Sequence, residues 1–160
     1  MTDFRIGYGN DIHRLAENRK LILGGVHIPH SMGLQGHSDA DVLIHAVIDA
    51  WLGALALGDI GSHFPDNDDR WKDADSRQLL AAVLALPASQ GWQLNNLDIT
   101  VNAQRPKLAP FIGEIREILA QDLHAPISRI SVKAKTGEHI GFVGREEGIM
   151  VQAVLTLKRI

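Results

Sequence analysis

Residues 40–57, ADVLIHAVIDAWLGALAL, are the most informative stretch for the fold. They are almost all apolar or alanine, contain no proline and are too long for an ordinary strand, so they predict a helix that Gly58 ends. Asp41, His45 and Asp49 are spaced four residues apart and therefore share one face of that helix. We expect a deeply buried helix with one polar stripe of acid, histidine and acid.

Alternating apolar residues predict strands on both sides of this helix. Residues 4–8 alternate before a loop, and residues 21–28 indicate a hairpin that turns at Gly24 and Gly25. The alternation returns in three later segments, which are residues 97–104, 130–134 and 148–157.

Two further helices and one long loop are expected between these strands. One helix is capped by Asp75 or Ser76 and runs to about Leu86, where Pro87 should end or kink it, and another follows Pro110. Residues 59–69 are rich in Gly, Pro, Asn and Asp and indicate a long ordered loop. The predicted fold class is α+β, a two-layer α/β sandwich with helices on one face of a mixed sheet, and residues 1–160 are expected to form a single domain.

Composition narrows the classes of function. The formal net charge of -3 provides no basic field for a nucleic acid, and no apolar run is long enough for a membrane span. The first residues lack the features of a secretory signal, so we expect a cytoplasmic protein. There is no cysteine but there are eight histidines, so any transition metal would be held by histidines and carboxylates.

Asp11 and His13 lie two residues apart, which directs both side chains to the same side of an extended segment. With His45 they would form a set of two histidines and one carboxylate, typical of catalytic zinc sites that leave one position open. Asp41 or Asp49 would orient these ligands from behind. The alternative is that His13 is a surface residue and His45 a hydrogen-bonded histidine of the core.

Two segments could bind phosphate groups. His37 and Ser38 precede the buried helix, where free N–H groups favour an anion, although Ser38 or Asp39 could equally serve only as a helix cap. Residues 133–145, KAKTGEHIGFVGR, combine lysines, a hydroxyl, a glutamate and glycines after a strand. They suit a diphosphate clamp with a ligand for a hard metal, or simply a glycine-rich turn.

Eight short motifs, in their order and spacing from residue 5 to about residue 155, resemble the 2-C-methyl-D-erythritol 2,4-cyclodiphosphate synthase family: DIH, GGVHIP, GHSDADVLIHA, LGDIGSHFPD, ADSRQLL, AQRPKLAP, KAKTGE and GFVGREEGI. The resemblance implies a phosphorus–oxygen lyase of the non-mevalonate isoprenoid pathway. That enzyme cyclises 4-CDP-2-C-methyl-D-erythritol 2-phosphate to 2-C-methyl-D-erythritol 2,4-cyclodiphosphate and releases CMP.

The resemblance also implies cofactors and catalytic residues. Asp11, His13 and His45 would hold Zn²⁺ or another divalent transition metal, and Glu138 would help to hold Mg²⁺. The catalytic residues His37 and Thr136 would steady the transferring phosphates. Ser38 would join His37 on the 2-phosphate.

Further substrate contacts are implied for three segments. The methylerythritol part would contact Asp59, Ile60 and Gly61 beneath a loop formed by Phe64, Pro65, Asp66, Asn67 and Asp68. The cytosine would be recognised by backbone groups of two segments. The first is Ala103, Gln104, Arg105, Pro106, Lys107, Leu108 and Ala109, and the second is Ala134, Lys135 and Thr136. Asp11, His13, Gly137, Glu138, Phe142 and Arg145 are further implied substrate contacts.

Family members are homotrimers with active sites between subunits, so residues 103–109 and 133–138 would face the metal site of an adjacent chain. Phe142 and Arg145 match the lining of a central cavity, where an isoprenoid diphosphate would bind. This sequence departs from the family at Lys135 and Gly137, where many members carry threonines.

Three alternatives to a stand-alone synthase are open. A metal-dependent phosphohydrolase could use the same clusters for attack by water. A non-catalytic trimer could store or sense isoprenoid diphosphates around a structural zinc ion. The chain could also be a fragment of a fusion with the preceding cytidylyltransferase.

Overall fold

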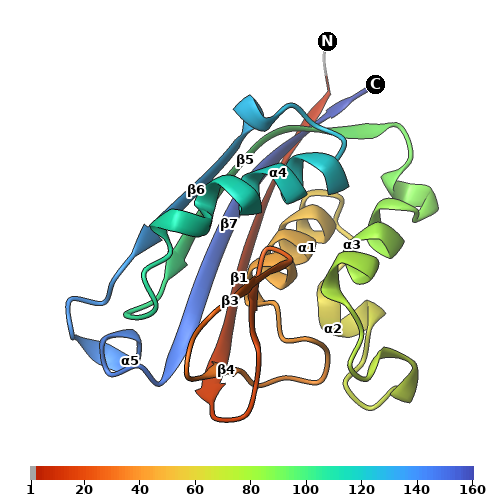
Figure 1. Cartoon of the computed structure of the whole chain (residues 1–160). Helices are drawn as coiled ribbons and strands as arrows, with labels where there is room; N and C mark the ends of the chain where they lie inside the picture. The colour runs from red at the N-terminus through yellow and green to blue at the C-terminus, as the bar shows by residue number, and fades with distance from the viewer. Residues whose placement is uncertain (1–2) are drawn as a thin grey trace.

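The computed structural model describes residues 3–160, and Figure 1 shows a sheet with helices packed against one of its faces. Within that range the main sheet has five strands in the order β4 (Gly33–Leu34), β1 (Phe4–Ala16), β7 (Gly148–Arg159), β5 (Trp92–Asn102) and β6 (Ile130–Lys135). Only β5 and β6 run parallel, and the other neighbours are antiparallel. The predicted mixed sheet with helices on one face is confirmed.

The predicted hairpin is also present, as strands β2 (Leu21–Leu23) and β3 (Val26–Ile28). Its turn residues Gly24 and Gly25 both have positive φ, at 58° and 78°, a conformation that glycine adopts without strain. The hairpin packs onto the core, because Leu21, Leu23 and Ile28 are buried in it.

The central helix α1 (Val42–Ala54) is shorter than the apolar stretch that predicted it. Its N-cap is Asp41, whose carboxylate accepts the Ile44 N–H at 3.1 Å, so the expectation that Ser38 or Asp39 caps the helix is wrong. The helix also ends before Gly58, because Ala56 already takes a left-handed conformation with φ 58°.

Strand β1 and helix α1 approach so closely that only glycine fits between them. A Cβ atom on Gly7 would lie 1.8 Å from the Ala50 carbonyl oxygen, and one on Gly9 would lie 1.9 Å from that of Ala46. Because side chains alternate along a strand, Asp11 and His13 point to the same side as these glycines. The close contact therefore places both side chains directly beside α1.

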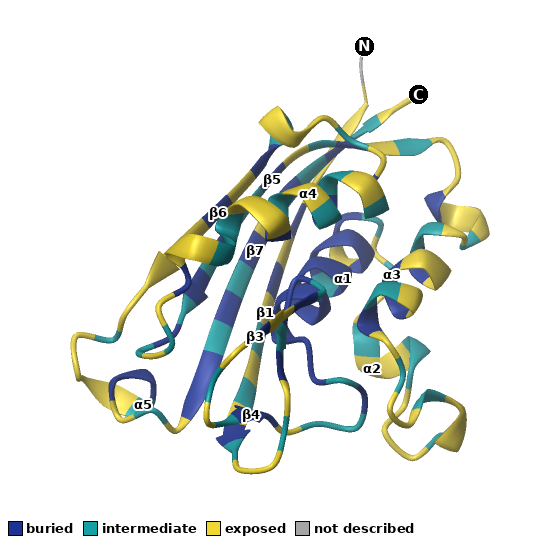
Figure 2. Ribbon diagram, viewed as in Figure 1, coloured by how far each residue is buried: buried dark blue, intermediate teal, exposed yellow. Residues whose placement is uncertain are grey.

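The core lies between the sheet and its helices. Figure 2 shows α1 as almost entirely buried, and alternate residues of β7 are buried beneath it, as predicted: Ile149, Val151, Ala153, Leu155 and Leu157. The opposite face of the sheet is uncovered in the single chain and carries exposed apolar side chains: Phe4, Ile6, Tyr8, Ile12 and Val154. Soluble monomers rarely expose a large apolar patch, and such patches commonly mark contact surfaces.

The remaining elements connect the strands. They are helices α2 (Ile60–His63), α3 (Ser76–Leu84), α4 (Ile112–Asp122) and α5 (Gly141–Gly144), and short 3-10 turns η1 (Asp69–Trp71), η2 (Pro87–Ser89), η3 (Ala109–Phe111) and η4 (Ile127–Arg129).

One expectation about these elements is confirmed and one is corrected. Helix α3 ends at Leu84, close to the predicted end, and Pro87 begins a separate 3-10 turn, so of the two outcomes predicted at the proline the helix ends and does not kink. Residues 59–69 do not form a continuous loop, because the Asp59 side chain caps α2 and the Asp68 side chain caps η1. Among the residues described, no helix has the length and apolar character needed to cross a membrane.

Candidate metal site and the two pockets

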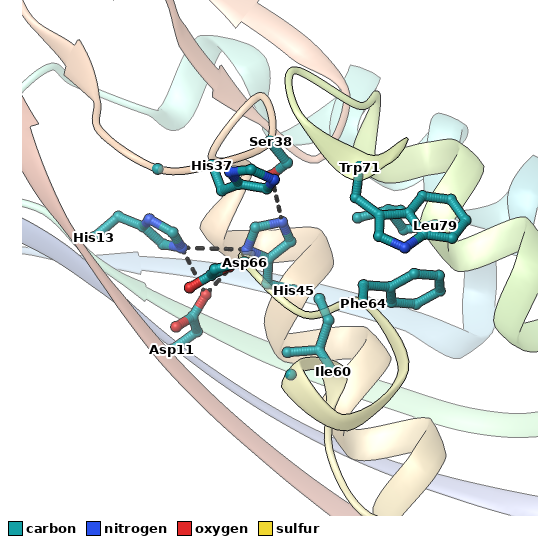
Figure 3. A pocket seen from close by; sticks show the side chains of 12 residues that line it. Asp11, His13, His37, Ser38, His45, Ile60, Phe64, Asp66, Trp71 and Leu79 are labelled. Atoms are coloured by element: carbon teal, nitrogen blue, oxygen red, sulfur yellow. Dashed lines mark hydrogen bonds and ion pairs between the residues drawn. The ribbon is translucent and has the colours of Figure 1, made fainter. Parts of the chain in front are cut away.

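Three side chains from two elements converge at the end of the β1–α1 contact (Figure 3). His13 Nε2 lies 2.9 Å from Asp11 Oδ2 and 3.2 Å from His45 Nδ1, and His45 Nδ1 lies 3.2 Å from Asp11 Oδ2. Asp11 and His13 come from β1 and His45 from α1. The sequence predicted that these residues would form one set, and the structure brings them together.

The donor set suits a divalent transition metal. Two imidazole nitrogens and one carboxylate oxygen lie within 4.8 Å of one another. Tetrahedral zinc with bonds of about 2.0–2.1 Å separates its ligand atoms by about 3.3–3.4 Å, so the three donors need only a small outward movement. A set of three protein donors leaves one position for water or substrate, which is the arrangement of catalytic sites.

The charges and hydrogen bonds of the cluster keep a proton on His13 that a metal ion would displace. Burial pushes the pKa of Asp11 upward, but hydrogen bonds to His13 and His45 and their charges hold it well below its usual range. Burial lowers the pKa of His13, but the hydrogen bond and charge of Asp11 outweigh this and raise it overall. Without a metal the two residues therefore form an ion pair, whose proton a cation would replace.

The predicted orienting role of Asp41 or Asp49 is wrong. The Asp41 carboxylate is fully buried and accepts the N–H groups of Gly24 and Gly25 at 3.0 and 2.7 Å, while Asp49 accepts the Ile60 N–H at 2.7 Å. Burial raises the pKa of Asp41 to about 6. Asp41 therefore fastens the β2–β3 hairpin to the start of α1 and does not contact the histidine rings.

Other groups hold the histidines instead. His13 Nδ1 lies 2.8 Å from the Gln35 carbonyl oxygen, and His45 Nε2 lies 2.8 Å from Ser76 Oγ and 3.1 Å from Ser38 Oγ. Sequence reasoning considered Ser76 only as a helix cap, yet Asp75 is the N-cap of α3. Ser76 stands in the ADSRQLL motif, which was the only feature of the sequence that could have pointed to it. Its contact with His45 could not be predicted, because it depends on the tertiary fold.

A cavity of about 230 Å³ opens beside the cluster. It is lined by Asp11, His13, Gly36, His37, Ser38, His45, Ile60, Gly61, Phe64, Asp66, Trp71 and Leu79. Most of these residues were predicted, whereas Asp59, Pro65, Asn67 and Asp68 lie in the same segment without lining the cavity. His37 Nε2 is close to the Asp68 carbonyl oxygen, at 3.3 Å, which ties the two walls together.

Trp71 is a cavity residue that the sequence did not reveal. Its ring meets Phe64 edge to face, with centroids 4.8 Å apart, and Figure 3 shows both rings on one wall. Its buried Nε1 has no hydrogen-bond partner among the described residues. Together Trp71 and Phe64 give the cavity an apolar side opposite the polar cluster.

A second pocket of about 600 Å³ contains the segments predicted to bind the nucleotide. It is lined by His30, Ala103, Gln104, Arg105, Pro106, Lys107, Leu108, Ala109, Ala134, Lys135 and Thr136. None of these residues lines the first cavity. His30 is the one residue lining this pocket that was not predicted, and nothing in its local sequence pattern indicates that it lies there.

The remaining predicted residues line neither cavity. Glu138 is exposed, and its N–H lies 3.3 Å from Thr136 Oγ1. A Cβ on Gly137 would lie 2.6 Å from the Gly144 nitrogen, so a residue larger than glycine would not fit this backbone. Phe142 lies in α5, and Arg145 Nε donates to Glu147 Oε2 at 3.0 Å.

Fold and site together define an α+β protein with a candidate catalytic metal centre. The chain belongs to the YgbB family, whose sequence model matches residues 4–158. It is similar to the 2-C-methyl-D-erythritol 2,4-cyclodiphosphate synthase of Geobacter metallireducens, with 62% identity over 97% of this chain and 99% of the relative. It is 58% identical to the enzyme of that name from Neisseria gonorrhoeae over the full length of both chains.

Solved structures agree. The bifunctional IspDF from Campylobacter jejuni superposes with a TM-score of 0.94 at 44% identity, over 100% of this chain and 43% of that longer one. This chain therefore spans less than half of the bifunctional protein. IspF of Plasmodium falciparum, in a CDP complex, superposes with a TM-score of 0.85 at 34% identity, over 99% of this chain and 98% of that one. The family resemblance expected from the motifs is confirmed.

Proposed function

We propose that the chain cyclises 4-CDP-2-C-methyl-D-erythritol 2-phosphate to 2-C-methyl-D-erythritol 2,4-cyclodiphosphate and releases CMP. Relatives at about 60% identity over nearly the whole chain carry the name of that synthase. One observation carries the proposal: the converging Asp11, His13 and His45 border a cavity whose walls combine polar and aromatic side chains.

The reaction needs no nucleophile from the protein. An oxygen of the 2-phosphate attacks the outer phosphorus of the CDP diphosphate, and the bond from that phosphorus to the bridging oxygen breaks, so CMP leaves with the bridging oxygen. Zn²⁺ or another divalent transition metal on the cluster would supply charge neutralisation and alignment of the two phosphates. Holding both ends of one molecule in line provides the high effective concentration that such a cyclisation requires.

The side chains around the cavity suit the methylerythritol 2-phosphate part. His37 and Ser38 offer a ring nitrogen and a hydroxyl to phosphate oxygens. Ile60 and Gly61 at the start of α2 would contact the carbon chain, with Asp59 as their cap. The Phe64–Trp71 wall would exclude water, which favours cyclisation over hydrolysis.

The second pocket suits the nucleotide part. Residues 103–109 offer mainly backbone groups, with Lys107 as a cationic side chain, and residues 134–136 offer the Thr136 hydroxyl. Glu138 would hold Mg²⁺ against the diphosphate. Because this pocket shares no residue with the cavity of the cluster, we propose that it completes the cluster of a neighbouring subunit.

A homotrimer is the proposed assembly. The exposed apolar side chains on β1 and β7, with Ile6 63% exposed and Tyr8 56% exposed, would be covered by the other copies. Phe142 and Arg145 would then line a central cavity able to take an isoprenoid diphosphate. We also propose that the enzyme works in the cytoplasm, since a nucleotide-linked diphosphate is too highly charged to cross a membrane unaided.

The test is incubation of the purified chain with the CDP substrate, Zn²⁺ and Mg²⁺, followed by phosphorus NMR. We expect CMP and the cyclic diphosphate in equal amounts, and no product from His45→Ala. A matched control is His124→Ala, which changes a histidine lining neither proposed half of the site. CMP with a linear product would instead indicate a hydrolase, and absence of turnover would favour a storage protein.

A further inference from the structure

We propose that Asp39 and Ser76 are positioning residues for His45, and that a carboxylate–hydroxyl–imidazole chain sets the affinity of the cluster for its metal ion. This inference rests on the metal site of the proposed function. It adds two residues that act through His45 and do not themselves ligate the ion.

The two ring nitrogens of His45 have different surroundings. Nδ1 faces Asp11 and His13, whereas Nε2 points away from them to Ser76 Oγ at 2.8 Å. Figure 3 shows the His45 ring between Asp11 and His13 on one side and Ser38 on the other. A ligating imidazole binds through its unprotonated nitrogen, so Nε2 must carry the proton and donate it. Ser76 Oγ is therefore the acceptor that selects the correct tautomer.

The Ser76 hydroxyl is itself oriented by Asp39. The hydroxyl donates its own proton to Asp39 Oδ1, and the Ser76 N–H donates to Asp39 Oδ2 at 3.1 Å. With both carboxylate oxygens bound to Ser76, the oxygen lone pairs of the hydroxyl remain directed at His45. The chain places a negative charge behind the imidazole, which makes the ring a stronger donor to a cation.

Ser38 also contacts Nε2, but its surroundings differ. Its Oγ lies 3.1 Å from Nε2 and accepts the Ala40 N–H at 3.2 Å, and no carboxylate oxygen among the described residues bonds to it. Ser38 lines the cavity, whereas Ser76 is fully buried. The two hydroxyls therefore differ in role. The Ser38 hydroxyl can contact substrate in the cavity, whereas the Ser76 hydroxyl contacts only protein groups and binds His45.

Backbone contacts hold this chain in place independently of any ion. The Asp39 N–H donates to the Ala74 carbonyl at 3.0 Å, and the Asp73 N–H donates to the His37 carbonyl at 2.8 Å. The segments before α1 and before α3 are thus fastened together at several points. His45 is oriented before metal binds, so loss of the chain should be visible in affinity and not only in turnover.

The experiment measures metal affinity of the full chain by competition with a chromophoric chelator, using Zn²⁺, and records the visible spectrum with Co²⁺. Ser76→Ala should weaken Zn²⁺ binding by about 10–100-fold and alter the Co²⁺ bands. Ser76→Thr keeps the hydroxyl and should restore most of the affinity. Asp39→Asn keeps the shape of the side chain but removes its negative charge and one hydrogen-bond acceptor. Like Ser76→Ala, it should weaken Zn²⁺ binding.

Ser38→Ala is the matched control, because it removes the other hydroxyl near the same nitrogen and should cost less affinity than Ser76→Ala. Equal losses from the two alanine variants, or unchanged affinity in Ser76→Ala and Asp39→Asn, would overturn the inference. Failure of the unsubstituted chain to bind Zn²⁺ would overturn the metal site together with it. Tight binding without turnover would overturn only the proposed reaction.

Discussion

Asp11 and His13 make metal binding a proton-coupled event. The pKa of His13 is raised by the hydrogen bond and charge of Asp11, so the metal-free protein keeps the His13 proton to higher pH than an isolated histidine would. A metal ion must displace that proton. Protonation therefore competes with the metal at low pH, and affinity should rise with pH until His13 is neutral.

We expect metal affinity to increase about tenfold per pH unit while His13 is protonated, and to level off above its raised pKa. Calorimetry in two buffers of different ionisation enthalpy should detect about one proton released per ion at about pH 6 and fewer at about pH 8. Asp11→Asn is the comparison, because without the carboxylate the His13 proton is held less firmly. Affinity that does not change across this range would contradict the proton count.

The contact between β1 and α1 is the element on which the site depends. Gly9→Ala places a methyl group where the Ala46 carbonyl oxygen lies, so strand and helix must separate. We expect a loss of about 3 kcal/mol in the free energy of unfolding, measured with urea. The cluster should weaken as well, because Asp11 and His13 are held on the strand that moves and His45 on the helix.

Gly113→Ala is the matched control for this substitution. Gly113 lies in α4, and nothing is within 4 Å of the position its Cβ would take. Alanine is a better helix former than glycine, so the variant should gain about 0.5–1 kcal/mol. A Gly9→Ala protein as stable as the unsubstituted chain would show that the contact can relax.

Local pattern predicted the strands well where polar and apolar residues alternate in the ordinary way, as in β7. In β1 the pattern was harder to interpret, because the buried side carries Gly7 and Gly9 while Phe4, Ile6 and Tyr8 are exposed. The length of that strand, and its contact with α1, could not be derived from hydrophobicity. The larger apolar residues of β1 lie on its exposed side, so their alternation does not mark the side that faces the core.

Some residues of the candidate site could be predicted from the sequence and others could not. The pairing of Asp11 and His13 followed from their spacing. His45 was a candidate third ligand from the residues alone, and the resemblance to a known family favoured it over the alternative of a hydrogen-bonded core histidine. Ser76 could not be inferred, because a serine at the start of a helix is ordinarily explained by capping. Its role depends on how α3 packs against the segment before α1, which is a property of the tertiary fold.

At the scale of the whole molecule, the uncovered side of the sheet should determine oligomeric state. Light scattering should give three times the chain mass of 17.5 kDa. Ile6→Asp puts a charge into the proposed interface and should yield smaller species with little turnover. Gln78→Asp, on the exposed face of α3, should leave the trimer intact. A monomeric unsubstituted chain with full turnover would contradict the shared site.

The separation of the two pockets within one chain has a genetic consequence. A variant defective in the metal cluster, such as His45→Ala, and one defective in the nucleotide pocket, such as Thr136→Ala, would each be inactive alone. If the two are mixed in the proposed trimer, the intact cluster of one chain would meet the intact nucleotide pocket of the other. Co-expression should restore about one site in four, so two null alleles would complement each other although neither chain carries a complete site.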